Sequence, residues 1–148
     1  ALKVWFTLQL YGTQRLGRMM EGTCELARYL ERRIAAEPEL ELLAPVSLNI
    51  VCFRYRGQPA ASMWHDAPRR NELDRSELKS NELNALNSEL VIALQESGIA
   101  APSSTLINGQ IAIRAALFNH RTTQHEVDAL CDATLKFGRK IKLLGIRP

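Results

Sequence analysis

The run NGQIAIRAALFN, at residues 108–119, contains one charged side chain, Arg114, in a stretch that otherwise resembles a protein interior. Alternation along a strand places Arg114 on the same face as Ala112, Ala116 and Phe118. A guanidinium in the middle of a strand needs an anion, because a desolvated and unpaired cation costs several kcal/mol. Arg114 therefore predicts either an internal salt bridge or a contact with an anionic ligand or interface.

Few other side chains of this sequence have the types and spacing that chemistry requires. Ser103 and Ser104, in PSSTLING, are able to donate hydrogen bonds to an anion, although turn residues before a strand explain them equally well. His65, His120 and His125 lack the spacing of metal ligands, so we interpret them as surface residues. The sequence has no glycine-rich phosphate loop and no serine nucleophile elbow.

The composition excludes several classes of partner. Cys24, Cys52 and Cys131 are odd in number and widely spaced, which predicts buried thiols in a reducing compartment. The net charge of +3 comes from 19 basic and 16 acidic residues that are mixed along the chain, so we expect no nucleic-acid partner. No apolar run reaches the roughly 18 residues needed to span a bilayer, and no signal peptide is apparent. We therefore expect a cytoplasmic protein without membrane contact.

The length of the chain bounds its organisation. With 148 residues, 46% hydrophobic and 24% charged, it is long enough to bury one core, so we expect a single domain over residues 1–148. The chain begins without methionine and inside a hydrophobic segment. This beginning predicts that the chain is a fragment of a longer protein.

The first 36 residues are predicted to form a helical lead-in. Residues 2–11 are apolar in nearly every direction, so this helix should be buried on most sides. Gly12 ends it, Thr13 is able to cap a second helix, and Pro38 ends that helix. Apolar residues at three-four spacing give the second helix one buried stripe, formed by Leu16, Met19, Met20, Thr23, Leu26, Ala27, Leu30 and Ile34.

The remaining chain alternates between strands and helices. Two strands are predicted in LELLAP and LNIVCFRYRG, and two more at 104–107 and 110–118. The last two are joined by Asn108-Gly109, the strongest short signal for a hairpin. Residues 58–80 are predicted as a connecting loop, followed by a helix over 82–97. A final helix is predicted from Thr123 to about Lys142.

The order α-α-β-β-α-β-β-α indicates a fold of the α/β class, α+β type. We expect a small antiparallel or mixed sheet of about four strands, with the helices packed on one face.

Five segments resemble, in order and spacing, one enzyme family. They are ALKVWFTLQLYG, LARYLERR, LELLAPVSLNIVCFRYRG, LNSELVIALQESG and PSSTLINGQIAIRAALFNHRTT. Together they are similar to the C-terminal small domain of the pyridoxal-phosphate-dependent group II amino-acid decarboxylases, which include the aromatic-L-amino-acid, tyrosine, glutamate and diaminobutyrate decarboxylases. The resemblance implies the small C-terminal domain of a type I fold PLP enzyme, and a parent that acts as a carboxy-lyase.

The resemblance also implies what this chain lacks. In that family the cofactor forms a Schiff base with a lysine that directly follows a histidine, and none of the lysines here does so: Lys3, Lys79, Lys136, Lys140 and Lys142. The family's other catalytic groups belong upstream of residue 1. The fragment is therefore expected to hold no catalytic residue, to bind no pyridoxal phosphate covalently, and to be inactive alone. Its expected partners are its own large PLP-binding domain and, in the parent, a second subunit.

The resemblance gives Arg114 a role as well. In glutamate-specific relatives an arginine on the corresponding strand approaches the substrate carboxylate, and Arg114 is the matching residue here. The segment 58–80 departs from the family pattern and looks like an insertion. Residues 2–11 would pack between domains of the parent, so the isolated chain is predicted to self-associate through them.

Two other functions stay open at this point. The chain is consistent with an autonomous small-molecule-binding or regulatory α/β module. It is equally consistent with a purely structural dimerisation domain, in which Arg114 would form a salt bridge with a carboxylate of this chain.

Overall fold

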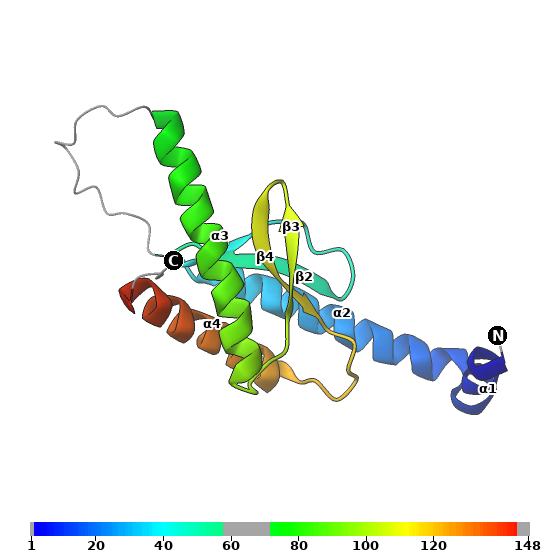
Figure 1. The fold of residues 1–148 in the computed structure, drawn as a ribbon. Helices are drawn as coiled ribbons and strands as arrows, with labels where there is room; N and C mark the ends of the chain where they lie inside the picture. Colours follow the sequence, from blue (N-terminus) through cyan, green and yellow to red (C-terminus); the bar gives the residue numbers. More distant parts are fainter. Residues whose placement is uncertain (1, 58–71, 145–148) are drawn as a thin grey trace.

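The computed structural model describes residues 2–57 and 72–144. Within them the predicted order of helices and strands is confirmed (Figure 1). The elements are α1 Leu2–Tyr11, α2 Thr13–Ala36, β1 Leu40–Leu42, β2 Ile50–Tyr55, α3 Glu72–Glu96, β3 Ser103–Ile107, β4 Gln110–Ala116 and α4 Gln124–Leu144.

The four strands form one antiparallel sheet in the order β1-β2-β4-β3. The β2–β4 pairing runs from Ile50 opposite Ala116 to Phe53 opposite Ile113. Strands β3 and β4 form the predicted hairpin: Asn108 has φ 50° and Gly109 has φ 76°, the left-handed conformations that a type I′ turn requires at both central positions.

The core lies between the sheet and a layer of three helices. Helix α4 packs between α2 and α3, and together they cover one face of the sheet. Alternation along β2 points Val51, Phe53 and Tyr55 into this core, where each is at most 1% exposed. They pack with buried leucines and isoleucines of the other elements, including Leu30, Ile34, Leu90, Leu94, Ile113 and Leu130. The other face of the sheet carries no described helix, and we call it the open face.

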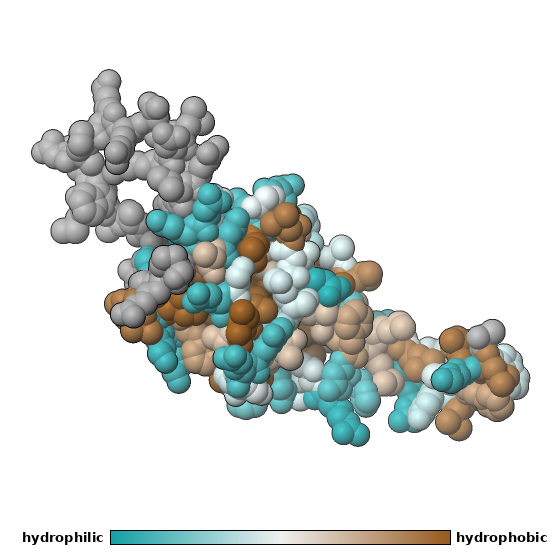
Figure 2. Space-filling model, in the orientation of Figure 1, coloured by the Kyte–Doolittle hydropathy of each residue, from teal (hydrophilic) through white to brown (hydrophobic). Residues whose placement is uncertain are grey.

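Helix α1 differs from the expectation that it is buried on most sides. None of its residues is buried, and Trp5 and Phe6 are more than half exposed. Figure 1 shows α1 at the far end of α2, beyond the sheet, and Figure 2 shows apolar residues gathered on this projecting arm. Among the described elements α1 makes its main contact with α2, so its apolar surface faces outward.

Helix α2 buries only the C-terminal half of its predicted stripe. Thr23, Ala27, Leu30 and Ile34 are buried, whereas Met20 is 69% exposed on the projecting part. The predicted cap is wrong: Gly12 occupies the N-cap with φ 73°, no side chain caps the helix, and Thr13 is its first residue.

Helix α3 begins at Glu72, ten residues earlier than predicted. Residues 72–80, predicted as the end of a long loop, are therefore helical. Glutamate, leucine, lysine and arginine are frequent in this stretch and all favour helix, so local propensity outweighs its high charge. The rest of the predicted loop, at 58–71, lies outside the described residues.

Candidate functional site

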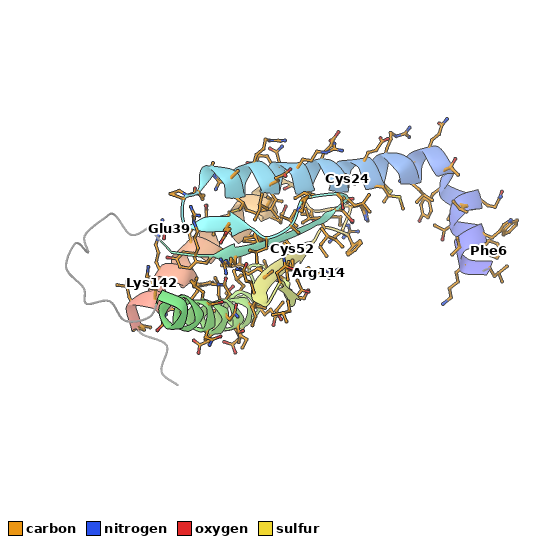
Figure 3. The ribbon with its side chains drawn as sticks, turned by 90° about the horizontal axis from the view of Figure 1, so that it is seen from above. Phe6, Cys24, Glu39, Cys52, Arg114 and Lys142 are labelled. Carbon is orange, nitrogen blue, oxygen red and sulfur yellow. The ribbon has the colours of Figure 1, made fainter. Side chains whose placement is uncertain are left out.

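Arg114 lies at the centre of the sheet. Its strand, β4, runs between β2 and β3, and Arg114 pairs with Cys52 on one side and with Ser103 on the other. Figure 3 shows Cys52 and Arg114 next to each other in the sheet. Both residues are half-buried, and alternation places them on the open face. A strand with neighbours on both sides holds the start of the Arg114 side chain rigidly.

Arg114 takes part in none of the ion pairs among the described residues. Those pairs join Arg33 to Asp128 and to Asp132, Arg54 to Glu41, and Arg139 to Glu39. Among the residues whose side chains the structure describes, 2–57 and 80–144, no carboxylate lies within 4.0 Å of its guanidinium. A half-buried cation without a local counter-ion favours an anion from outside this part of the chain.

The sheet separates the two serines that were predicted together. Ser103 is paired with Arg114 and shares its face, whereas Ser104 is paired with Ile113, whose side chain points toward the helices. Because side chains alternate between faces, the hydroxyl groups of Ser103 and Ser104 cannot act on one anion beside Arg114. Ser103 remains as a hydrogen-bond donor, and Thr105 lies farther along β3 on the same face.

Arg54 also belongs to the open face, but it is neutralised. Its place at the end of a strand suggests a solvated residue; instead Arg54 is 9% exposed. Its Nε and Nη2 atoms each lie 2.8 Å from Oε2 of Glu41, the residue opposite it on β1. The pairing of β1 with β2 brings the two together, which sequence spacing does not reveal. Of these two arginines, Arg114 is the one available to a ligand.

Cys52 is a neighbour of Arg114 that sequence reasoning missed. Burial raises the pKa of its thiol, and the nearby Arg114 guanidinium opposes that effect. The thiol is therefore protonated at neutral pH and is a poor nucleophile. Cys52 makes the surface beside Arg114 apolar rather than reactive.

The other candidate groups offer little chemistry. His120 and His125 are exposed, as predicted, and His65 lies outside the described residues. All three cysteines are free, with Cys131 buried and Cys24 half-buried. The described residues contain no cluster of three or more histidine, cysteine or acidic side chains placed for a metal, and none of their helices is long and apolar enough to cross a membrane.

One cavity of about 240 Å³ lies beside the end of β4 and the start of α4. It is lined mainly by alanines and leucines, together with Thr122 and Glu126. Arg114 is not among its lining residues. The Glu126 carboxylate is already engaged, because it accepts hydrogen bonds from the backbone N–H and hydroxyl of Thr123 at the start of α4. Arg114 is therefore not part of this cavity, although Ala116, on the same face of β4, lines it.

Several known proteins are similar to this chain in sequence. The family described as "Pyridoxal-dependent decarboxylase conserved domain" matches residues 1–56. Tyrosine decarboxylase 3 of Petroselinum crispum is 30% identical over 143 residues, covering 89% of this chain and 25% of that protein. The aromatic-L-amino-acid decarboxylase of Bacillus atrophaeus is 27% identical over 145 residues, covering 98% of this chain and 25% of that protein.

Solved structures share the fold. The crystal structure of Oryza sativa TDC with PLP and tryptamine has a TM-score of 0.74 at 21% identity, covering 95% of this chain and 26% of the other. The glutamate decarboxylase domain of a Vibrio parahaemolyticus protein has a TM-score of 0.69 at 24% identity, over 94% of this chain. This chain thus spans about a quarter of the length of the curated relatives that it matches.

Proposed function

We propose that this chain, which spans only about a quarter of the curated relatives that it matches, belongs to the group II pyridoxal-phosphate-dependent decarboxylase family and is the small C-terminal domain of such an amino-acid decarboxylase. The parent would be a carbon–carbon lyase that removes the carboxyl group of an amino acid. The observation that supports this most strongly is the combination of a family match over residues 1–56 with one shared fold over nearly the whole chain.

The chemical role of the domain is to orient the substrate carboxylate through Arg114. Three observations support it: the residue is half-buried, it stands on a central strand, and it has no carboxylate partner among the described residues. The planar guanidinium suits a two-point hydrogen bond to a carboxylate. Ser103, on the same face, is a second donor toward the same anion. Holding the carboxylate in one direction selects which bond to the Cα atom breaks.

Pyridoxal phosphate supplies the electron sink for this chemistry when it is bound. The residues of this chain do not fit its covalent attachment in the manner of the family, because no lysine here follows a histidine. We therefore assign the cofactor to the large domain of the parent, and to this chain only the positioning of the carboxylate. No catalytic residue is assigned within the chain.

The open face and α1 are the surfaces proposed to meet the large domain. Helices cover the opposite face of the sheet, so a contact through the open face would place Arg114 at the boundary of a cleft between domains. Helix α1 exposes apolar side chains over its whole length, which suits a buried position between domains. Through these contacts the domain would close the cleft and support the homodimer of the parent. Three free thiols are typical of the reducing cytoplasm, where we place the enzyme.

The deciding experiment is to sequence the reading frame upstream of Ala1 and to express the whole protein. We expect that frame to encode a histidine-lysine pair within a pyridoxal-binding sequence, and the whole protein to release CO₂ from an amino acid. A frame without that pair, or a purified whole protein that binds pyridoxal phosphate but decarboxylates none of the amino acids, would contradict the proposal.

Calorimetry separates this proposal from an autonomous binding module. Titrated with free amino acids, the 148-residue chain alone should give no binding heat, because it provides only one side of the cleft. Micromolar binding to the isolated chain would favour the binding module instead. A purely structural role has less support, because the salt bridge that it predicts for Arg114 is not found among the described residues.

A further inference from the structure

The hydrogen-bonded pairing of β2 and β4 stops earlier than the strands themselves. Its last pairs are Cys52 opposite Arg114 and Phe53 opposite Ile113. Both strands continue beyond this point with their outer neighbours, since Tyr55 still pairs with Leu40 of β1. On the other side, β4 still pairs with β3 as far as Gln110. The sheet therefore divides between its two central strands, next to Arg114.

Two asparagines of α3 take the place of the missing strand contacts. Asn87 is fully buried, its Oδ1 accepts the backbone N–H of Tyr55 at 2.9 Å, and its Nδ2 donates to the carbonyl of Tyr55 at 2.9 Å. Asn84 does the same for β4: its Oδ1 accepts the N–H of Ile111 at 2.8 Å, and its Nδ2 donates to the carbonyl of Gly109 at 2.9 Å. A spacing of three puts both side chains on one face of the helix.

This arrangement has an energetic reason. Backbone groups buried without a partner cost about 1–3 kcal/mol each, so the buried N–H and carbonyl of Tyr55 need another partner where β2 parts from β4. A side-chain amide offers donors and an acceptor in much the same geometry as a backbone peptide. Asn84 and Asn87 thus hold one strand each, and the position at which the two strands part is determined by α3.

We propose that Asn84 and Asn87 are positioning residues for Arg114, clamping β4 and β2 to α3 so that the guanidinium stays beside Cys52 on the open face. The functional meaning of this clamp rests on the proposed carboxylate contact of Arg114. The clamp itself does not, because its effect on the geometry of the sheet is measurable in the chain alone.

Cys52 provides the reporter, since it is the cross-strand neighbour of Arg114. The experiment measures the rate of Cys52 alkylation by iodoacetamide against pH in the 148-residue chain carrying Cys24→Ser. Buried Cys131 is distinguished by peptide mapping. Arg114→Gln gives the reference, because loss of the positive neighbour should move the profile to higher pH. Asn87→Ala and Asn84→Ala should each move it in the same direction, toward the Arg114→Gln profile.

A matched control lies at the other end of the same two strands. Asn49 donates from Nδ2 to the carbonyl of Leu117 at 3.0 Å, where β2 and β4 are still joined by the backbone bond from Leu117 N–H to the Asn49 carbonyl. Asn49→Ala should leave the Cys52 profile in place. Thermal unfolding followed by circular dichroism checks that every variant is folded. If Asn87→Ala does not fold, the Cys52 profile of Asn84→Ala tests the positioning role.

Wild-type profiles for folded Asn84→Ala and Asn87→Ala would overturn the positioning role, as would an equal shift in Asn49→Ala. A shifted profile together with unimpaired decarboxylation by Arg114→Ala in the whole enzyme would keep the clamp and reject the carboxylate role of Arg114. The two failures are therefore distinguishable.

Discussion

Gly138 of α4 faces the ring of Tyr55 so closely that a Cβ atom at position 138 would lie 2.7 Å from the ring carbons Cγ and Cδ2. Tyr55 is fully buried at the end of β2, so its ring has nowhere to move. A glycine inside a helix normally weakens it, yet here the missing side chain allows α4 to approach the sheet. Helix and strand are packed as tightly as the backbone of α4 permits.

Gly138→Ala should lower the free energy of unfolding by about 1–3 kcal/mol, the usual cost of overpacking a core. Urea denaturation of the 148-residue chain measures it. Gly22→Ala is the matched control, because a Cβ atom at position 22 of α2 would meet no atom within 4 Å and alanine is the better helix former. Gly22→Ala should stabilise the chain slightly; equal destabilisation by both changes would contradict the packing argument.

Glu39 predicts an acid dependence of stability. It is 3% exposed, accepts a hydrogen bond from Arg139 Nε at 3.0 Å, and accepts another from the Tyr55 hydroxyl at 2.8 Å. The hydrogen bond from Arg139 holds the pKa of Glu39 below its ordinary value of 4.5. The Glu39 carboxyl therefore binds a proton more readily in the unfolded chain than in the folded one. The stability that ionised Glu39 contributes is complete above pH 4.5 and is lost as the pH falls through the folded-state pKa.

Glu39→Gln should cost about 1.5–3 kcal/mol of unfolding free energy at pH 7, the range for hydrogen bonds to charged groups. Below about pH 4.5, the ordinary pKa of the carboxyl, its stability should fall less steeply than that of the wild type. Urea denaturation at several pH values tests both statements. Glu96→Gln, at the exposed end of α3, should keep the wild-type profile. Parallel profiles for wild type and Glu39→Gln would exclude Glu39 as the titrating group.

Arg114 predicts a kinetic effect in the whole enzyme. Arg114→Ala should lower kcat/KM by about 10- to 100-fold, since a hydrogen bond to a charged group contributes about 1.5–3 kcal/mol. Arg114→Lys should restore only part of the activity, because an ammonium lacks the planar fork. Arg121→Ala, in the exposed loop before α4, serves as the control. Unchanged kinetics with Arg114→Ala would remove the residue from substrate binding.

Helix α1 predicts association of the 148-residue chain. Light scattering should show a mass that rises above the monomer with concentration, because the apolar helix lacks cover among the described residues. Leu10→Glu should lower that mass. Leu106→Glu is matched to it, since Leu106 on β3 is 67% exposed and Leu10 is 75% exposed, yet only Leu10 belongs to α1. A monomer at high concentration would contradict the prediction, as would an equal effect of both changes.

The fold class, the order of the elements and the hairpin at Asn108-Gly109 were determined by the sequence itself. These features depend on local physics: apolar spacing, turn residues that accept positive φ, and helix-ending glycine and proline act over a few neighbouring residues. We predicted a loop over residues 72–80 because high charge is typical of a loop. Their strong helix propensity outweighs that signal, so α3 starts earlier than predicted. Alternation of side chains along the chain is also sufficient to assign Arg114 to one face of a strand.

The surroundings of Arg114 were decided by the tertiary structure alone. Strand pairing places Ser103, and not Ser104, on the face of Arg114, and it places Cys52 beside Arg114. It also brings Arg54 to its counter-ion, Glu41. Those contacts join residues on different strands, so spacing along the chain carries no signal of the partner. The exposure of α1 is also a tertiary property. Its sequence shows that the helix is apolar, but not which surface, if any, packs against it.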